Sequence, residues 1–117
     1  MHNTPRLCPY FHSAVELIGR RWTGAIIYVL LEGRTRYAGL RAAIPEITDR
    51  MLCERLRELE QEGIVERIVV PETPVRVEYA LTEKGLALGR AVDAIGAWAH
   101  DWHRLPDGED AARNAAC

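Results

Sequence analysis

Residues 48–81 read TDRMLCERLRELEQEGIVERIVVPETPVRVEYAL, and this stretch decides the fold. Its first half predicts an amphipathic helix, Thr48–Glu62, which ends at Gly63 because glycine adopts the left-handed conformation at little cost. Two strands are expected next, Ile64–Val70 and Val75–Leu81, joined by a turn that two prolines bound. A helix followed at once by a β-hairpin is typical of a winged helix, so the stretch points to an element that reads DNA.

The predicted helix has an apolar face and a charged face. Leucines at positions 52, 56 and 59 recur at helical spacing, and Thr48 fits the N-cap. With the leucines facing a core, the outward row is Arg50, Glu54 and Arg57. Arginine can contact base edges or phosphate there, and glutamate can accept a hydrogen bond from cytosine. The alternative is a solvated face on which these three side chains pair with one another.

Eight residues are predicted to contact DNA. Arg36 precedes a short helix, near whose N-terminus phosphate is often received. Arg76 lies beside the wing turn, where it can touch phosphate or enter a minor groove; a cross-strand charge pair in a plain hairpin is the alternative. The complete predicted set is Arg36, Thr48, Asp49, Arg50, Met51, Glu54, Arg57 and Arg76.

Three further helices are expected before this stretch, at residues 12–18, 22–31 and 37–43. The second is apolar almost all round, which indicates a central, buried helix. Pro45 interrupts the chain between the third helix and the capped one, giving the order of a helix-turn-helix. We therefore predict one α+β domain, mostly α, with an N-terminal arm and helix (1–20), a helix-turn-helix (36–62), a two-stranded wing (64–81), a dimerisation helix (82–104) and a flexible tail (105–117).

The predicted C-terminal helix begins after Thr82, a second plausible N-cap. Its apolar residues recur with a coiled-coil-like spacing over about four turns, which favours pairing between two copies of the chain. Its tryptophans are expected to pack in the core and the interface, and a ligand pocket framed with Trp22 at the interface is the alternative. The predicted dimer interface is Leu88, Val92, Ile95, Trp98, Ala99 and Trp102.

Length and composition narrow the class of protein. The chain has 117 residues, 48% of them hydrophobic, which fits one ordinary domain with a real core. No apolar run approaches the roughly 18 residues of a membrane span, so a cytoplasmic protein is expected. The net charge of −2 argues mildly against a nucleic-acid partner. Between positions 34 and 57, however, six arginines face three acidic residues, so the positive charge lies near the predicted reading helix.

Residue patterns for catalysis and metal binding are weak. Three widely spaced cysteines, Cys8, Cys53 and Cys117, predict neither a disulfide scaffold nor a zinc site. His100 and His103, with Asp101 between them, lack an evident third metal ligand. The sequence contains no P-loop, GxSxG or HExxH motif. We expect no enzymatic activity, no metal and no cofactor.

Several segments together resemble the HxlR-type winged-helix transcription regulators. The resemblance covers about residues 8–98, and its order and spacing fit throughout. The matching segments are Cys8-Pro9, Ile18-Gly-Arg-Arg-Trp22, Leu31-Glu-Gly-Arg-Thr-Arg-Tyr37, Arg55–Arg67 and Pro71–Gly85. Two departures stand out: Arg20 replaces a common second glycine, and Asp49 puts an acid near the start of the recognition helix.

The resemblance implies a bacterial-type regulator that pairs through its terminal helices and places Thr48–Glu62 in DNA. It also implies that Cys8 is a candidate sensor of oxidants or electrophiles, whereas a buried or unreactive thiol is the alternative. We therefore expect a homodimeric repressor that recognises a specific DNA sequence. Its operator is expected to be double-stranded and pseudo-palindromic. The alternative function is a winged-helix protein-interaction module without DNA binding. A weaker third hypothesis is a cysteine-dependent enzyme.

Overall fold

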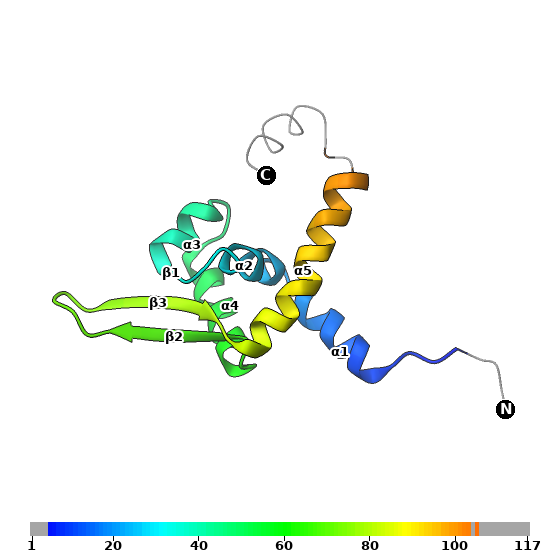
Figure 1. Cartoon of the computed structure of the whole chain (residues 1–117), viewed down its shortest axis with the longest axis horizontal. Helices are drawn as coiled ribbons and strands as arrows, with labels where there is room; N and C mark the ends of the chain where they lie inside the picture. The colour runs from blue at the N-terminus through cyan, green and yellow to red at the C-terminus, as the bar shows by residue number, and fades with distance from the viewer. Residues whose placement is uncertain (1–4, 104, 106–117) are drawn as a thin grey trace.

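The computed structural model describes residues 5–103 and Leu105. Its helices and strands surround one small core, and the β2–β3 hairpin projects from it on the side of α3, away from α1 (Figure 1). Helix α5 crosses the body and extends beyond it. In chain order the elements are α1 (Pro9–Ile18), α2 (Thr23–Leu30), β1 (Thr35–Arg36), α3 (Tyr37–Ala43), α4 (Asp49–Gln61), β2 (Val65–Val70), β3 (Arg76–Leu81) and α5 (Glu83–Trp102).

The core forms where α2, α3 and α4 meet the base of the hairpin. The predicted leucine stripe is confirmed, since Leu52, Leu56 and Leu59 are the buried residues of α4. The prediction of a central apolar helix also holds, because Ile26 and Ile27 of α2 are fully buried. Burying a side chain of this size stabilises the fold by roughly 1.5–3 kcal/mol. The remaining core residues are Leu30, Leu40, Ile44, Ile47, Ile64, Val65 and Val92.

The predicted capping residues lie at the helix ends. The Thr48 hydroxyl accepts a hydrogen bond from the Met51 amide at 3.1 Å, and Thr82 accepts one from Gly85 at 3.0 Å. Gly63 has a φ of +74°, the left-handed conformation that ends α4. Gly85 has a second role, because a Cβ at this position would collide with the carbonyl oxygen of Ile64. The glycine therefore lets α5 start directly against the hairpin.

The winged-helix architecture is confirmed, but its sheet has three strands rather than the two predicted. The strand order is β1-β3-β2, all antiparallel. In β1, Thr35 lies opposite Tyr79 and Arg36 lies opposite Glu78. Two residues are too few to show the alternation that reveals a strand in sequence. This strand exists only through its pairing with β3, a contact between residues distant in the chain.

Other element boundaries differ slightly from the predictions. Helix α1 begins at Pro9 rather than at residue 12, because proline suits the first position of a helix. Helix α2 begins at Thr23, since Trp22 has a φ of +75° and cannot continue a right-handed helix. Helix α5 ends at Trp102. Arg104 and the predicted tail beyond Leu105 lie outside the described residues.

Candidate nucleic-acid interface

Helix α4 presents arginines on its outer face. Arg50 and Arg57 are exposed, whereas Glu54 and Met51 are half-buried. The structure shows no ion pair among Arg50, Glu54 and Arg57 within the part of the chain that it describes. The alternative of a face neutralised by its own ion pairs therefore lacks support. Both guanidinium groups remain available to phosphate or to base edges.

Asp49, the acid that departs from the family pattern, is held by two side chains from α3. The Arg41 Nε lies 3.0 Å from its Oδ1, and the Tyr37 hydroxyl donates to the same oxygen at 2.8 Å. Arg41 also donates to the carbonyl oxygen of Ile47. The negative charge of Asp49 is thus compensated locally, so it opposes an approaching phosphate less than the sequence indicates.

Tyr37 and Arg41 hold α3 against α4, a role that the sequence did not predict for either residue. Burial raises the pKa of Tyr37 above its ordinary value, and its contacts with Cys53 and Asp49 raise the pKa further. The phenol is therefore protonated at neutral pH and acts as the donor to Asp49. The Cys53 Sγ lies 3.7 Å from the same hydroxyl. The partners of Tyr37 and Arg41 lie beyond α3, on α4 and in the turn before it. No residue pattern within α3 could therefore indicate these contacts.

The wing contains a compact set of opposite charges. Arg76 lies 2.9 Å from Glu72 and 2.9 Å from Glu78, and Arg34 lies 2.8 Å from the other oxygen of Glu78. Arg76 Nε faces Glu78 Oε2, and Arg34 Nε faces Glu78 Oε1. Neither Arg76 Nε nor Glu78 Oε1 has a well-aligned hydrogen bond among the described residues, so both contacts are ion pairs. Arg76, predicted to contact DNA, is thus engaged within the wing. Its partners lie in the turn and on its own strand β3, so they do not form the cross-strand pair of the alternative interpretation. Arg67 on β2 is exposed and was not predicted as a contact.

Arg36 ends β1 and immediately precedes α3. Its side chain is exposed and makes no capping hydrogen bond to the helix. No ion pair to Arg36 occurs among the residues in the described ranges. It therefore remains a candidate phosphate contact, together with the exposed backbone at the start of α4 around Thr48 and Asp49.

The predicted dimer seam on α5 divides into two parts. Val92 is buried within the protomer's own core, and Leu88 packs against that core, because α2 lies against this part of α5. Ala99 is half-buried. Ile95, Trp98 and Trp102 are 54%, 59% and 75% exposed, far more than large apolar side chains in a protein core.

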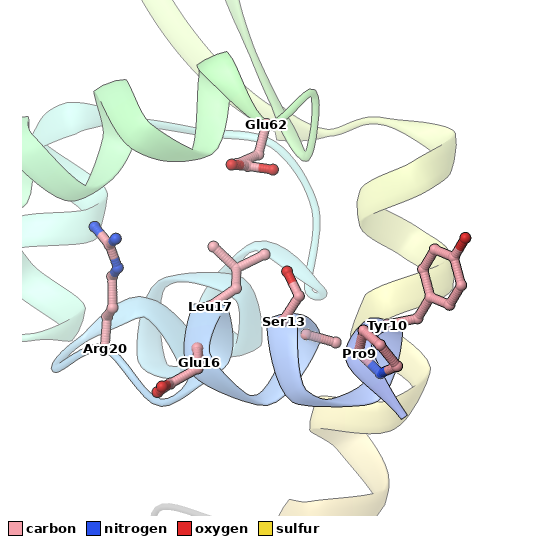
Figure 2. A pocket seen from close by; sticks show the side chains of 8 residues that line it. Pro9, Tyr10, Ser13, Glu16, Leu17, Arg20 and Glu62 are labelled. Atoms are coloured by element: carbon pink, nitrogen blue, oxygen red, sulfur yellow. The ribbon is translucent and has the colours of Figure 1, made fainter. Parts of the chain in front are cut away.

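Helix α1 packs only loosely on the protomer, through Leu17 and its contact with α2. It has no buried residue, and Tyr10, Phe11 and Val15 are among the exposed large hydrophobic residues. Between α1 and the C-terminal end of α4 lies an open groove of about 570 Å³. Figure 2 shows Leu17 and Ser13 of α1 on one side of this groove and Glu62 on the other.

Cys8 is the N-cap residue of α1, and it is exposed. Its carbonyl oxygen accepts a hydrogen bond from the His12 amide at 2.9 Å. The His12 imidazole lies 3.5 Å from the Glu16 carboxylate, on the next turn of α1. Cys53 is exposed as well. Among the described residues, no group of three or more metal-binding side chains comes together, and no helix is both long and apolar enough to cross a membrane.

Comparison with known proteins gives a consistent result. The HxlR-like helix-turn-helix family model matches residues 17–106. The HTH-type regulator YodB of Bacillus subtilis is 52% identical over 99 residues, which cover 85% of this chain and 87% of that protein. YvaP, a regulator of the same type from Bacillus subtilis, is 47% identical over 100 residues, covering 86% and 93% of the two chains.

Two solved structures share the fold. The reduced form of YodB superposes with a TM-score of 0.75 at 49% identity, covering 87% of this chain and all of that one. The redox regulator HypR in its oxidized form superposes with a TM-score of 0.77 at 38% identity, covering 84% of this chain and all of that one. Since the family model spans most of the sequence and both regulators match over most of their length, this chain belongs to the HxlR-like helix-turn-helix family.

Proposed function

We propose that the protein is a homodimeric repressor that binds a specific double-stranded operator and releases it when an oxidant or electrophile modifies Cys8. The observation that carries this proposal is the outer face of α4, where Arg50 and Arg57 are exposed next to a wing. The family consists of helix-turn-helix regulators, so the chain's own surface matches the function of its relatives.

DNA binding follows from the shape and charge of this surface. A recognition helix enters the major groove with its N-terminal residues toward base edges. In this chain those residues are Thr48, Asp49 and Arg50, and Arg57 follows two turns later on the same face. The capture of Asp49 by Arg41 removes one support for the alternative, a protein-interaction module without DNA binding.

Homodimerisation is supported by apolar surface that the protomer leaves uncovered. Exposed aromatic residues lie on α1 and along the distal half of α5, and patches of this kind mark interaction sites. A two-fold dimer through these helices supplies two recognition helices. Half-sites about one helical turn apart, roughly 34 Å, then form a pseudo-palindromic operator.

Control by an electrophile is supported by the relatives and by the exposure of Cys8. YodB has been solved reduced, diamide-treated and quinone-bound, and HypR both reduced and oxidized. In this chain the Cys8 thiol can add through its thiolate to a ring carbon of a quinone, which forms one C–S bond. The thiol proton goes to one quinone oxygen and the hydrogen of the attacked ring carbon to the other, so the ring becomes a substituted hydroquinone. Cys8 is the N-cap residue of α1, so an adduct there lies at the start of a helix of the proposed dimer interface.

The decisive experiment is operator binding measured by fluorescence anisotropy. The probes are DNA from upstream of the protein's own gene and a shuffled duplex of equal length. We expect saturable binding at low micromolar protein or below, weakened by salt, with preference for the upstream DNA. Equal affinity for both duplexes contradicts sequence-specific binding. Absence of binding together with capture of a protein partner favours the interaction module.

A further inference from the structure

A set of charged groups joins the recognition helix α4 to the segment between α1 and α2. The Arg55 Nε donates to the Arg21 carbonyl oxygen at 2.9 Å, and its Nη1 donates to both Glu58 oxygens at 3.1 and 3.0 Å. The Arg20 Nη1 lies 3.1 Å from Glu58. We refer to these groups, the side chains of Arg20, Arg55 and Glu58 with the Arg21 carbonyl, as the Arg55 latch.

The geometry of the latch restricts how the Arg55 side chain can move. The Arg55 side chain is only 15% exposed, so water screens its ion pair less than it screens a surface pair. The planar guanidinium binds in two directions at once, which fixes its orientation as well as its distance. It therefore transmits a displacement of one helix to the other better than a flexible lysine does.

The carbonyl that Arg55 binds belongs to a constrained turn. The next residue, Trp22, has a φ of +75°, which a non-glycine residue adopts only when its surroundings hold it there. The Thr23 amide donates to the Arg20 carbonyl oxygen at 3.1 Å, and the Arg21 guanidinium lies 5.0 Å from the centre of the Trp22 ring. The turn presents its carbonyl to α4 in one fixed direction.

Helix α1 has few other means of fixing its position against α4. It buries none of its residues in the protomer, and the groove of about 570 Å³ separates it from the C-terminal end of α4. In Figure 2, Arg20 projects toward α4 at the end of α1, at the edge of this groove. The latch therefore lies where α1 gives way to the turn, at the point of contact with the recognition helix.

We propose that Arg55 and Glu58 are positioning residues that set the angle of the recognition helix relative to α1, and hence the spacing of the two recognition helices in the dimer. This inference rests on the proposed function, in which α1 and α5 pair with a second copy and α4 binds DNA. Neither residue belongs to the exposed Arg50 and Arg57 face. The latch governs which half-site spacing the dimer accepts, while the contacts of each α4 with its own half-site are made by other residues.

The test compares Glu58→Gln with Glu60→Gln in the full-length protein. Both substitutions remove one carboxylate from α4, but no ion pair involves Glu60 among the described residues. Anisotropy is measured with the operator, with operators lengthened or shortened by one base pair at the centre, and with an isolated half-site. For the wild type and Glu60→Gln we expect the affinity to fall about tenfold when the spacing of the half-sites is altered. For Glu58→Gln we expect the affinity to fall about threefold or less with the same change in spacing.

The affinity for an isolated half-site shows whether a substitution changes the spacing of the recognition helices or impairs DNA binding by each α4 itself. We expect Glu58→Gln and Glu60→Gln to bind the half-site equally, because their charge change is the same. A spacing penalty of wild-type size in Glu58→Gln overturns the inference and leaves the proposed function intact. Absence of any operator preference in the wild type overturns both.

A measurement without DNA tests the latch independently and covers a variant that folds poorly. Amide hydrogen exchange is followed in the wild type and in Arg20→Ala, whose side chain is already 54% exposed. We expect the Thr23 amide to exchange several-fold faster in the variant, while the core amides of Leu52 and Leu56 keep their protection. Unchanged exchange at Thr23 overturns the latch as a constraint on the turn.

Discussion

Arginine residues near the recognition helix divide into two groups by their partners. Arg50 and Arg57 are exposed without an ion pair in the described part of the chain. Arg41 instead binds Asp49 of α4, and Arg55 binds Glu58 of its own helix and the turn before α2. The cluster of positive charge in the sequence is therefore only partly available to DNA. The same division explains how a chain with a net charge of −2 can still present a local cationic surface.

Arg50→Ala and Arg57→Ala are expected to differ in kind. Loss of a base contact at Arg50 costs about 1–3 kcal/mol per half-site and relaxes sequence preference there. Loss of a phosphate contact at Arg57 weakens binding to all sequences. It also makes the binding constant less dependent on salt: the slope of its logarithm against the logarithm of salt concentration becomes shallower by about two, because each protomer loses one contact. Salt titrations on operator and shuffled DNA measure both effects. If the two variants lose affinity in the same pattern, the assigned roles are wrong.

Cys8 and Cys53, the exposed cysteines among the described residues, are expected to respond differently to a quinone. Treatment of the reduced wild type with a benzoquinone should reduce operator affinity at least about tenfold, the lower range of coupling needed for a useful switch. Cys8→Ser should keep its affinity under the same treatment, and Cys53→Ser should respond like the wild type. Mass spectrometry of the adducts checks which thiol reacts. A full response in Cys8→Ser removes Cys8 as the sensor and directs attention to Cys53.

Elements with their own periodicity could be predicted from the sequence, and elements that depend on distant partners could not. The spacing of leucines predicted α4, and alternation predicted β3 and its hairpin. Strand β1 has two residues and no pattern of its own. The contacts of Tyr37 with Asp49 and of Arg55 with Arg21 likewise depend on how helices pack. The candidate DNA face was thus predictable as a row of residues, but its availability required knowing where every other charged group binds.

The junction of α3 and α4 gives a prediction about stability and pH. Tyr37→Phe removes the hydrogen bond to Asp49 and should lower the free energy of unfolding by about 1 kcal/mol at pH 7. The pKa of the Tyr37 phenol is raised in the folded state, so its contribution is complete below the ordinary value of about 10 and declines as pH rises beyond it. Urea unfolding at pH 7 and pH 10.5 measures the difference in the free energy of unfolding between the wild type and Tyr37→Phe. A difference that is larger at pH 10.5 than at pH 7 contradicts the raised pKa.

The wing gives a prediction in which stability and DNA affinity change in opposite directions. Glu78→Gln removes the charge that Arg34 and Arg76 share. Its side chain is 13% exposed, so we expect a loss of roughly 1–2 kcal/mol, discounted for the exposure of both arginines. The freed guanidinium groups should strengthen binding to shuffled DNA at low salt. Glu66→Gln on β2 makes the same charge change without these partners, and equal effects in both variants would exclude a specific role for Glu78.

At the scale of the whole molecule, a small core leaves two helices partly outside it. The core joins α2, α3, α4 and the hairpin base, while α1 contributes no buried residue and α5 contributes Val92 near its middle. The distal half of α5 carries exposed tryptophans instead. In the proposed dimer, a second copy covers α1 and this half of α5, and this contact would set the distance between the recognition helices.

Ile95→Asp should therefore convert the dimer into a monomer, because it places a charge within the apolar surface that the second copy covers. Val69→Asp is the matched control, since Val69 on the wing is 51% exposed and Ile95 is 54% exposed. Sedimentation at micromolar protein should give the monomer mass for Ile95→Asp and the dimer mass for both Val69→Asp and the wild type. Operator affinity of Ile95→Asp should fall to that of an isolated half-site, since one recognition helix then binds alone. A dimer mass for Ile95→Asp would place the interface elsewhere, and a monomeric wild type would remove the two-fold operator from the proposed function.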